Sequence, residues 1–184
     1  MQKYGWWKSA LLVTGLLSAP LMSQASLIYA GGHLGRSSSF NSSVDGLSNE
    51  DWASFGWSVD GGTGVLPFLD IGGNITSYGM TRYSDNQGDD GSSVLTGYNG
   101  YARMQLSVPT LPLFVNVKGG LGILYRGSVN DHGSHSNLSF FWGVSAGYHM
   151  TQNWDLSVSF QQNRGHGEVP NGNLTSAGLT YYFL

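Results

Sequence analysis

The chain has 184 residues, a formal net charge of −3 and no cysteine, and 10% of its residues are charged. A soluble domain usually carries about 25% charged residues, so something other than charge must cover this surface. Beyond residue 25, six basic residues face eleven acidic ones, which argues against a nucleic acid as partner. The lack of cysteine excludes a secreted domain held together by disulfides.

The first 25 residues have the features of an export signal. Two lysines near the start supply positive charge, an apolar core covers residues 10–21, and Ser23-Gln24-Ala25 has the small-x-small form of a cleavage site. The apolar core is too short to span a bilayer as a helix. The sequence therefore predicts a signal peptide at residues 1–25 and one mature domain over residues 26–184.

Hydrophobicity in the mature domain alternates with a period of two residues. The alternation is strict over residues 154–161, where one face of the expected strand is apolar and the other polar. It recurs over residues 113–126 and 138–149. Fainter versions cover residues 27–36, 52–62, 68–82, 94–107 and 174–184. We therefore expect eight strands, several of them about as long as a tilted membrane strand.

The connections between these strands alternate between short and long. Tight turns are expected at residues 64–67, 109–112 and 150–153, and long polar loops at residues 37–51, 83–92, 128–137 and 165–173. Short turns at one end and long loops at the other are typical of a transmembrane barrel.

Side-chain size argues against a soluble sandwich or a lipocalin-like barrel. The apolar faces carry Trp, Phe, Tyr and Leu, whereas the other faces carry mostly Ser, Gly, Asn and Gln. The interior of an eight-stranded barrel is narrow, so the bulky face is expected to contact lipid. The sequence predicts an all-β fold, an eight-stranded antiparallel up-and-down transmembrane β-barrel in a bacterial outer membrane.

Several segments carry a family resemblance, most clearly the last loop and strand. They are Glu168-Val169-Pro170-Asn171-Gly172-Asn173-Leu174, the closing Thr175-Ser176-Ala177-Gly178-Leu179-Thr180-Tyr181-Tyr182-Phe183, Gly31-Gly32-His33-Leu34-Gly35, Lys118-Gly119-Gly120-Leu121-Gly122 and Met150-Thr151-Gln152-Asn153. With these segments, residues 26–184 resemble the N-terminal transmembrane barrel of the OmpA-type outer-membrane family. The resemblance implies delivery by the barrel assembly machinery, whose C-terminal signal here is Leu179, Tyr181 and Phe183, followed by Leu184.

Two departures from the family limit what the resemblance implies. Full-length members continue into a peptidoglycan-binding domain, whereas this chain ends at Leu184, so we expect no anchoring to the cell wall. Family barrels also hold an ion-pair gate in the lumen. The matching positions here are Gly147 and Ser157, which cannot form that gate, so pore activity does not carry over.

Five charged residues are expected inside the barrel, in the half near the short turns. They are Asp60, Asp70, Arg103, Lys118 and Asp155. Opposite charges in a narrow interior should pair, because an unpaired charge there is costly. We therefore expect an ion-pair cluster that plugs the lumen, in preference to a conducting path.

Four arginines each end a strand just below a long loop. They are Arg36, Arg82, Arg126 and Arg164. Guanidinium groups match phosphate oxygens well, so this rim is a candidate contact for lipopolysaccharide phosphates. The alternative is that charged residues simply belong at strand ends near the water interface.

The long loops contain weaker candidates for chemistry. His132 and His135 could meet His166 and Glu168 at a surface zinc site, but Gly/Ser-rich loops with this spacing disfavour one. His135 beside Ser136 is similar to the catalytic pair of lipid A deacylating barrels, yet adjacent strand residues point to opposite faces. We therefore expect no metal, no cofactor and no enzymatic activity.

The functional prediction is a non-enzymatic barrel that stabilises the outer membrane or presents its loops for adhesion. Its expected partners are outer-membrane lipid, lipopolysaccharide and an extracellular ligand bound by the four long loops. The alternatives are a lipid A-modifying enzyme and a small porin-like channel.

Overall fold

The computed structural model describes residues 28–40, 43–44, 47–49, 52–84, 90–128, 133–166 and 169–183. The predicted signal peptide lies outside these residues. The strands within them are β1 (Ile28–Phe40), β2 (Ser43–Val44), β3 (Leu47–Asn49), β4 (Trp52–Leu66), β5 (Leu69–Ser84), β6 (Asp90–Ser107), β7 (Leu113–Arg126), β8 (His135–His149), β9 (Trp154–Arg164) and β10 (Asn171–Phe183).

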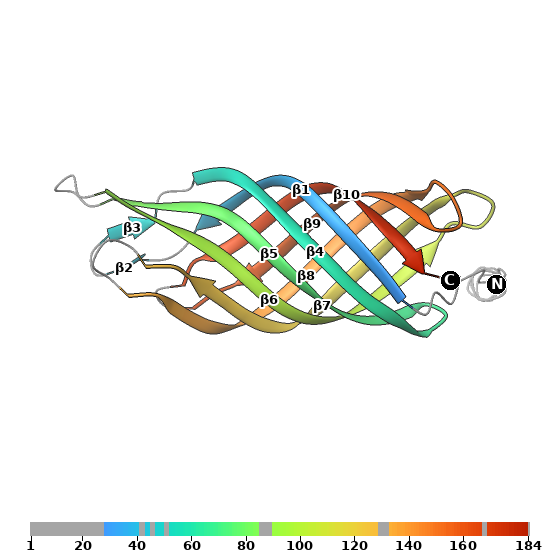
Figure 1. Ribbon diagram of the computed structural model, residues 1–184, viewed down its shortest axis with the longest axis horizontal. Helices are drawn as coiled ribbons and strands as arrows, with labels where there is room; N and C mark the ends of the chain where they lie inside the picture. The colour runs from blue at the N-terminus through green and yellow to red at the C-terminus, as the bar shows by residue number, and fades with distance from the viewer. Residues whose placement is uncertain are drawn as a thin grey trace, which may run out of the picture.

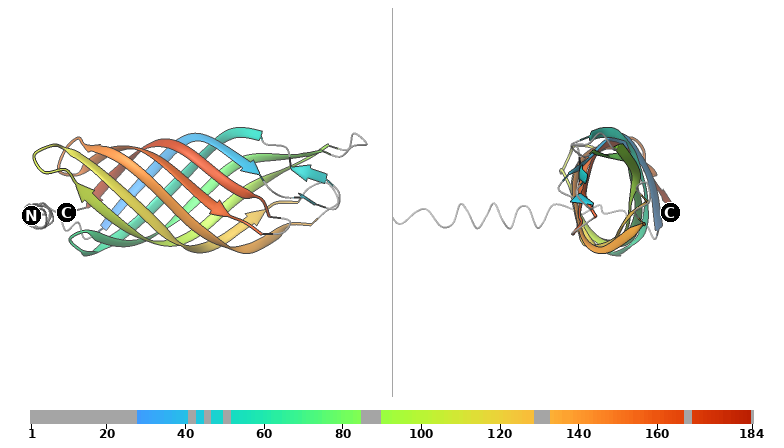
Figure 2. Two further views of the ribbon diagram at one scale, coloured as in Figure 1. Left: turned by 180° about the vertical axis from the view of Figure 1, so that it is seen from behind. Right: turned by 90° about the vertical axis from the view of Figure 1, so that its left-hand side faces the viewer.

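Eight of these strands form a closed antiparallel barrel (Figure 1). From β4 to β10 each strand pairs with the next, β1 pairs with β4, and β1 pairs with β10 from Ile28 opposite Phe183 to Phe40 opposite Asn171. Seen end on, the strands form a closed oval ring (Figure 2). Closure leaves the barrel without a free sheet edge. The predicted up-and-down barrel is confirmed.

The strands extend further toward the long loops than the alternating pattern predicted. β1 continues to Phe40 instead of residue 36, β6 begins at Asp90 instead of residue 94, and the expected first loop contains the short hairpin β2–β3. β3 also pairs with β5. Backbone pairing needs no apolar side chains, so a ladder can continue where the apolar pattern has ended. The first short turn also lies slightly later than predicted, between Leu66 and Leu69.

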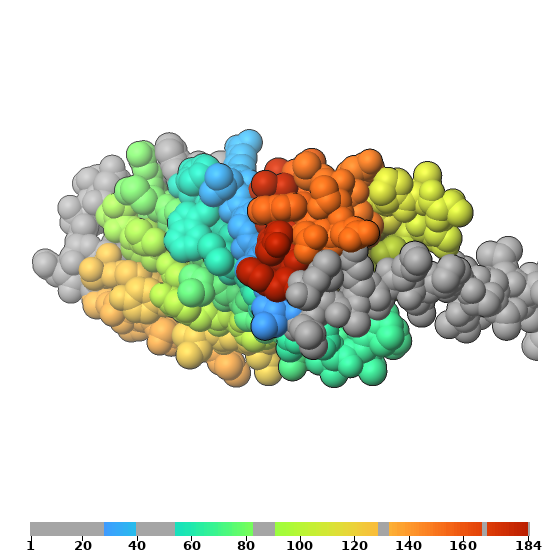
Figure 3. All heavy atoms as spheres, turned by 45° about the vertical axis from the view of Figure 1, so that its right-hand side comes forward, coloured from blue at the N-terminus to red at the C-terminus, as the bar shows by residue number. Residues whose placement is uncertain are grey.

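The barrel wall has the expected two faces. On β9 the side chains of Trp154, Leu156 and Val158 are exposed, whereas those of Ser157 and Ser159 point into the barrel and are buried. The outer surface is continuous where the chain closes on itself, with β1 beside β10 and β4 (Figure 3). Within the described residues, no helix is long and apolar enough to cross a membrane.

A bulge in β5 changes which side chains face outward near the outer end. The pairing with β6 shifts between Ser77 and Met80, and Gly79 has a φ of 72°, which favours glycine. Beyond the bulge, Thr81 is buried and Arg82 is exposed. Strict alternation from the exposed Ile75 would have placed Arg82 inside the barrel.

Candidate functional site

An ion pair stands at the short-turn end of the lumen, which faces the periplasm in outer-membrane barrels. The Nη2 and Nε atoms of Arg103 lie 2.7 Å and 2.8 Å from Oδ2 of Asp70. The same guanidinium lies over the ring of Tyr29, 3.9 Å from its centroid. Arg103 thus has both a carboxylate and an aromatic face as partners in a buried position.

The other two aspartates of the predicted cluster pair with histidines. Asp60 Oδ1 lies 3.2 Å from His33 Nε2, and its Oδ2 accepts a hydrogen bond of 3.1 Å from the Tyr101 hydroxyl. Asp155 Oδ1 lies 2.7 Å from His149 Nδ1. Neither histidine was among the predicted lumen residues, although both occupy inward positions of the alternating pattern.

Lys118 has aromatic neighbours in place of a carboxylate. Its Nζ lies 5.4 Å from the ring centroids of Tyr101 and Phe141, and the described part of the chain gives it no ion pair. The five predicted residues therefore lie together in the lumen, but Arg103 and Asp70 form the one pair of opposite charges among them. The remaining contacts come from histidines and aromatic rings.

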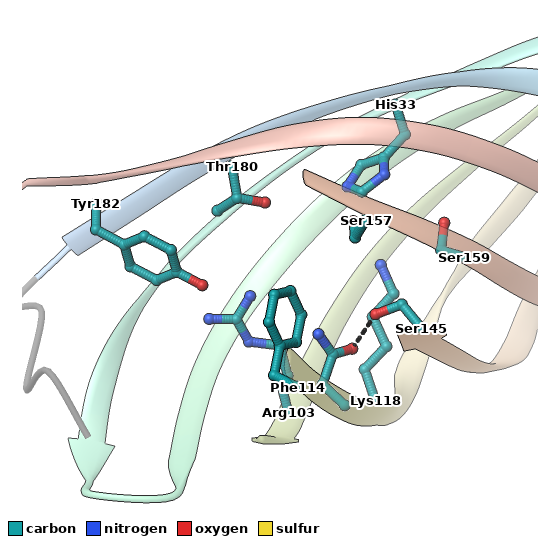
Figure 4. A pocket seen from close by; sticks show the side chains of 10 residues that line it. His33, Arg103, Phe114, Lys118, Ser145, Ser157, Ser159, Thr180 and Tyr182 are labelled. Atoms are coloured by element: carbon teal, nitrogen blue, oxygen red, sulfur yellow. Dashed lines mark hydrogen bonds between the residues drawn. The ribbon is translucent and has the colours of Figure 1, made fainter. Parts of the chain in front are cut away.

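A small cavity lies beside this charged layer (Figure 4). Its volume is about 20 Å³, and its walls include Arg103, Lys118, Phe114 and Tyr182. A cavity of this size has room for about one water molecule. The cavity therefore interrupts the packing of the lumen beside the charged layer by the space of about one water molecule.

Amide side chains cross the middle of the lumen. Asn163 of β9 donates a hydrogen bond of 2.8 Å to Asn99 of β6, and Asn99 donates one of 2.8 Å to Asn74 of β5. Gln161 of β9 reaches Thr76 of β5 at 2.8 Å. Because β9 is not adjacent to β5 or β6 in the sheet, the bonds made by Asn163 and Gln161 cross the lumen and tie separate parts of the barrel wall together.

Apolar side chains fill the lumen toward the long loops. They form a cluster of Tyr78, Leu95, Leu124, Val169 and Leu174, each at most 1% exposed. Val169 comes from the connection between β9 and β10, so part of that connection folds into the barrel mouth. The charged filling of the lumen was predicted from the sequence, whereas this apolar cluster was not.

The four arginines predicted at the rim do not share one orientation. Arg36, Arg82 and Arg164 are exposed on the outer face. Arg126 is fully buried inside the barrel, where its Nη2 donates a hydrogen bond of 3.1 Å to the carbonyl of Gly133. Arg126 occupies an inward position of β7, so it cannot take part in the lipid contact predicted for it.

Of the loop candidates, His135 and Ser136 are both exposed at the start of β8, and the carbonyl of His166 accepts a hydrogen bond from Asn137. Ser136 pairs with the outward Tyr125 and His135 with the inward Arg126, so neighbouring positions alternate between faces as expected. His132 and Glu168 lie outside the described residues. Within the described residues, no group of three or more potential metal ligands comes together.

A closed antiparallel barrel with apolar side chains outside and a polar interior defines an outer-membrane β-barrel protein. The family model described as outer membrane protein beta-barrel domain matches residues 9–183. The chain belongs to this family of bacterial outer-membrane barrels. No curated protein sequence matches the chain.

Solved structures with the same fold include Neisserial surface protein A, which has 19% sequence identity and a TM-score of 0.63 over 86% of this chain and 98% of that one. The N-terminal barrel of Pseudomonas aeruginosa OprF has 14% identity and a TM-score of 0.53 over 87% of this chain and 100% of its own. Yersinia pestis Ail, solved with the heparin analogue sucrose octasulfate, has 11% identity and a TM-score of 0.52 over 85% and 99%. The predicted resemblance to small OmpA-type barrels is confirmed.

Proposed function

We propose that this protein is a non-enzymatic outer-membrane barrel that acts through its outer surface and its loops. The observation that carries this proposal is the filling of the lumen at three levels. Ion pairs occupy one end, amide hydrogen bonds the middle and an apolar cluster the other end. With its interior occupied in this way, the barrel offers its exposed surfaces for function.

Two roles fit such a surface. Two of the exposed rim arginines, Arg36 and Arg164, favour contact with lipopolysaccharide phosphates, which would strengthen the outer leaflet. The long loops favour binding of an extracellular partner. Ail, the attachment invasion locus protein of Yersinia pestis, has the same fold, which supports the adhesion role for the loops at residues 37–51, 83–92, 128–137 and 165–173.

Conductance separates this proposal from the channel alternative. Refolded wild-type protein in a planar lipid bilayer should give no stepwise current, because the lumen is filled. As a matched control, the same preparation should show heat-modifiable migration on gels, which reports a folded barrel. Regular single-channel steps from folded protein would contradict the proposal.

Lipid A mass spectrometry distinguishes the proposed non-enzymatic role from the alternative of a lipid A-modifying enzyme. Cells with and without the protein should have the same lipid A acyl pattern, since His135 and Ser136 lie on opposite faces of the wall. A protein-dependent acyl change that disappears in His135→Ala would overturn the non-enzymatic assignment.

The surface role itself is tested in cells that lack the protein. These cells should be more sensitive to detergent, and wild-type protein should restore resistance. If the loops carry the function instead, a variant with residues 85–89 replaced by Asn-Gly should restore detergent resistance but lose attachment of the cells to a host-cell monolayer. No change in either phenotype would contradict both roles.

A further inference from the structure

The apolar outer face of the barrel is longer on some strands than on others. On β7 the outward apolar positions run from Leu113 to Tyr125, but on β9 they run from Trp154 to Phe160. They are equally short on β1, from Ile28 to Leu34, and on β10, from Ala177 to Phe183. A tilted membrane strand spans about 9–11 residues, so the apolar face on β9, β10 and β1 ends early.

Polar side chains continue this outer face toward the long loops. We call them the polar wall; its members are Arg36, Ser38, Gln162, Arg164, Asn173 and Thr175. Arg36, Arg164 and Thr175 are exposed and the other three are half-buried. On β7, two strands away from β9, the apolar outer face continues through Leu121, Ile123 and Tyr125.

Hydrogen bonds on the outside of the barrel organise the polar wall. Gln162 Oε1 accepts bonds of 2.9 Å from Trp142 Nε1 and 3.3 Å from Arg164 Nε. Gln162 Nε2 donates a bond of 2.8 Å to Asn173 Oδ1. The amides therefore hold Arg164 and Asn173 in place across two neighbouring strands, as a preformed binding surface requires.

The six members of the polar wall include two arginines and no carboxylate. Asp60, Asp70 and Asp155 all have their side chains in the lumen, and within the described ranges neither Arg36 nor Arg164 forms an ion pair. A guanidinium has five N–H donors and no acceptor. A ligand for this surface must therefore bring anionic acceptor atoms.

We propose that the polar wall binds the phosphorylated headgroup of an outer-leaflet glycolipid, the lipopolysaccharide of the proposed function, on which this inference rests. Arg36 pairs with Thr175, which pairs with Phe160. Arg164 is thus two strands away and four residues further along, about 10 Å across and about 14 Å along the sheet. Two flexible arginines at this spacing can hold two phosphates of one disaccharide headgroup.

A second copy of the chain fits this surface less well. A symmetric contact places the same patch on both partners. Arg36 and Arg164 of one copy would then face the polar wall of the other copy, which contains no carboxylate. The proposal also reduces the four predicted rim arginines to two, Arg36 and Arg164. Arg126 is buried, and Arg82 lies on β5, where the neighbouring strands present no other outward arginine among the described residues.

Native mass spectrometry of the purified full-length barrel tests the site with bisphosphorylated lipid A as the probe. The double variant Arg36→Ala, Arg164→Ala should bind at least 10-fold more weakly than wild type, because two charge-assisted contacts are lost. Arg82→Ala is the matched control, since it also removes one exposed rim arginine, and it should change binding less than 2-fold. An equal loss in Arg82→Ala would overturn the polar wall as the site.

The choice of lipid tests the ligand class. Dephosphorylated lipid A and phosphatidylglycerol should each bind wild type at least 10-fold more weakly than bisphosphorylated lipid A. Equal binding of phosphatidylglycerol would show a general affinity for anionic lipid and overturn the glycolipid assignment. A wild-type dimer that dissociates in the double variant would assign the wall to a second copy instead.

A second variant removes the organising amides without touching the charges. Gln162→Leu, Asn173→Leu should weaken lipid A binding about 3-fold to 10-fold while keeping heat-modifiable migration, because leucine suits an outward strand position. Unchanged binding would contradict the role of the amides. Conductance is independent of this site, so a silent bilayer together with no binding of lipid A by the wild-type protein would keep the non-conducting barrel of the proposed function and refute the site alone.

Discussion

The two ends of the lumen are filled by different chemistry. Near the short turns, Arg103 and Asp70 hold each other beside the ring of Tyr29. Near the long loops, Leu95, Leu124 and Leu174 pack with two other apolar residues and need no specific partner. The charged end depends on every member being present, whereas the apolar end depends on volume. The two ends should therefore respond differently to substitution.

The largest effect is expected at Arg103. The Arg103→Met variant should lower the free energy of unfolding by about 3–5 kcal/mol, because it leaves Asp70 without its charged partner in a partly buried position. Urea unfolding in detergent micelles, followed by tryptophan fluorescence, measures this loss. Adding Asp70→Leu should restore part of the stability, since no charge then remains unpaired. If the double variant is less stable than the single one, the charged end does not behave as a pair.

A substitution at the apolar end should lower the free energy of unfolding by less. Removing a charged residue elsewhere should not restore that loss. Leu124→Ala should cost about 3 kcal/mol, because the buried cluster is left with a cavity. The outward Leu121→Ala is a matched control on the same strand. Its loss should be smaller, since detergent or lipid can fill the space that the side chain leaves. Equal losses at the two positions, measured by the same urea unfolding, would argue against a packed apolar plug.

The boundary between the two ends should be sensitive to a single hydroxyl. Tyr78 belongs to the apolar cluster, but its hydroxyl donates a hydrogen bond of 3.1 Å to Asn163 of the amide layer. Tyr78→Phe should lower stability by about 1 kcal/mol. Tyr125→Phe, on the outer face, should leave the urea midpoint unchanged within error. A loss at Tyr78 well above 2 kcal/mol would show that the amide layer depends on this one bond.

The smallest expected effect is the coupling between the two ends. Arg103 and Leu124 lie on adjacent strands but well apart along them, because Leu124 pairs with Gly97. Their substitutions should add within about 0.5 kcal/mol in a double-mutant cycle. A coupling energy above about 1 kcal/mol would mean that the lumen behaves as one cooperative unit.

The alternating pattern identified the barrel because period two is a local property of each strand. Trp154, Asp155, Leu156 and Ser157 show their faces without knowledge of any other strand. The same argument placed the charges inside the lumen. The contact between His149 and Asp155 could also have been predicted, because the two residues pair across the tight turn that the sequence indicates.

Side chains that meet across the lumen were beyond that reasoning. Whether Asn163 meets Asn99, or Gln161 meets Thr76, depends on the closed cross-section of the barrel, which no single strand specifies. The inward rings were missed for a related reason. Gly172 makes room for Tyr78, since a Cβ there would lie 2.7 Å from a ring carbon. A small residue on one strand thus allows a large one on another.

The rim illustrates the limit most clearly. Arg36, Arg82, Arg126 and Arg164 look equivalent as strand-end arginines in the sequence. They lie on different faces because Arg126 occupies an inward position of β7. Arg82 faces outward because the bulge at Gly79 shifts the alternation of β5 by one residue. Such a bulge changes the face of every later residue in its strand, and its position depends on packing against the neighbouring strands.

The pairing of β1 with β10 also has a consequence for how the protein is made. This seam joins the first strand of the barrel to the last, from Ile28 opposite Phe183 to Phe40 opposite Asn171. It can form only after the entire domain has emerged and crossed to its destination. Until then, every partially assembled form exposes two unsatisfied strand edges, which are templates for aggregation. We therefore expect a chaperone or membrane-bound assembly factor to cover those edges during biogenesis.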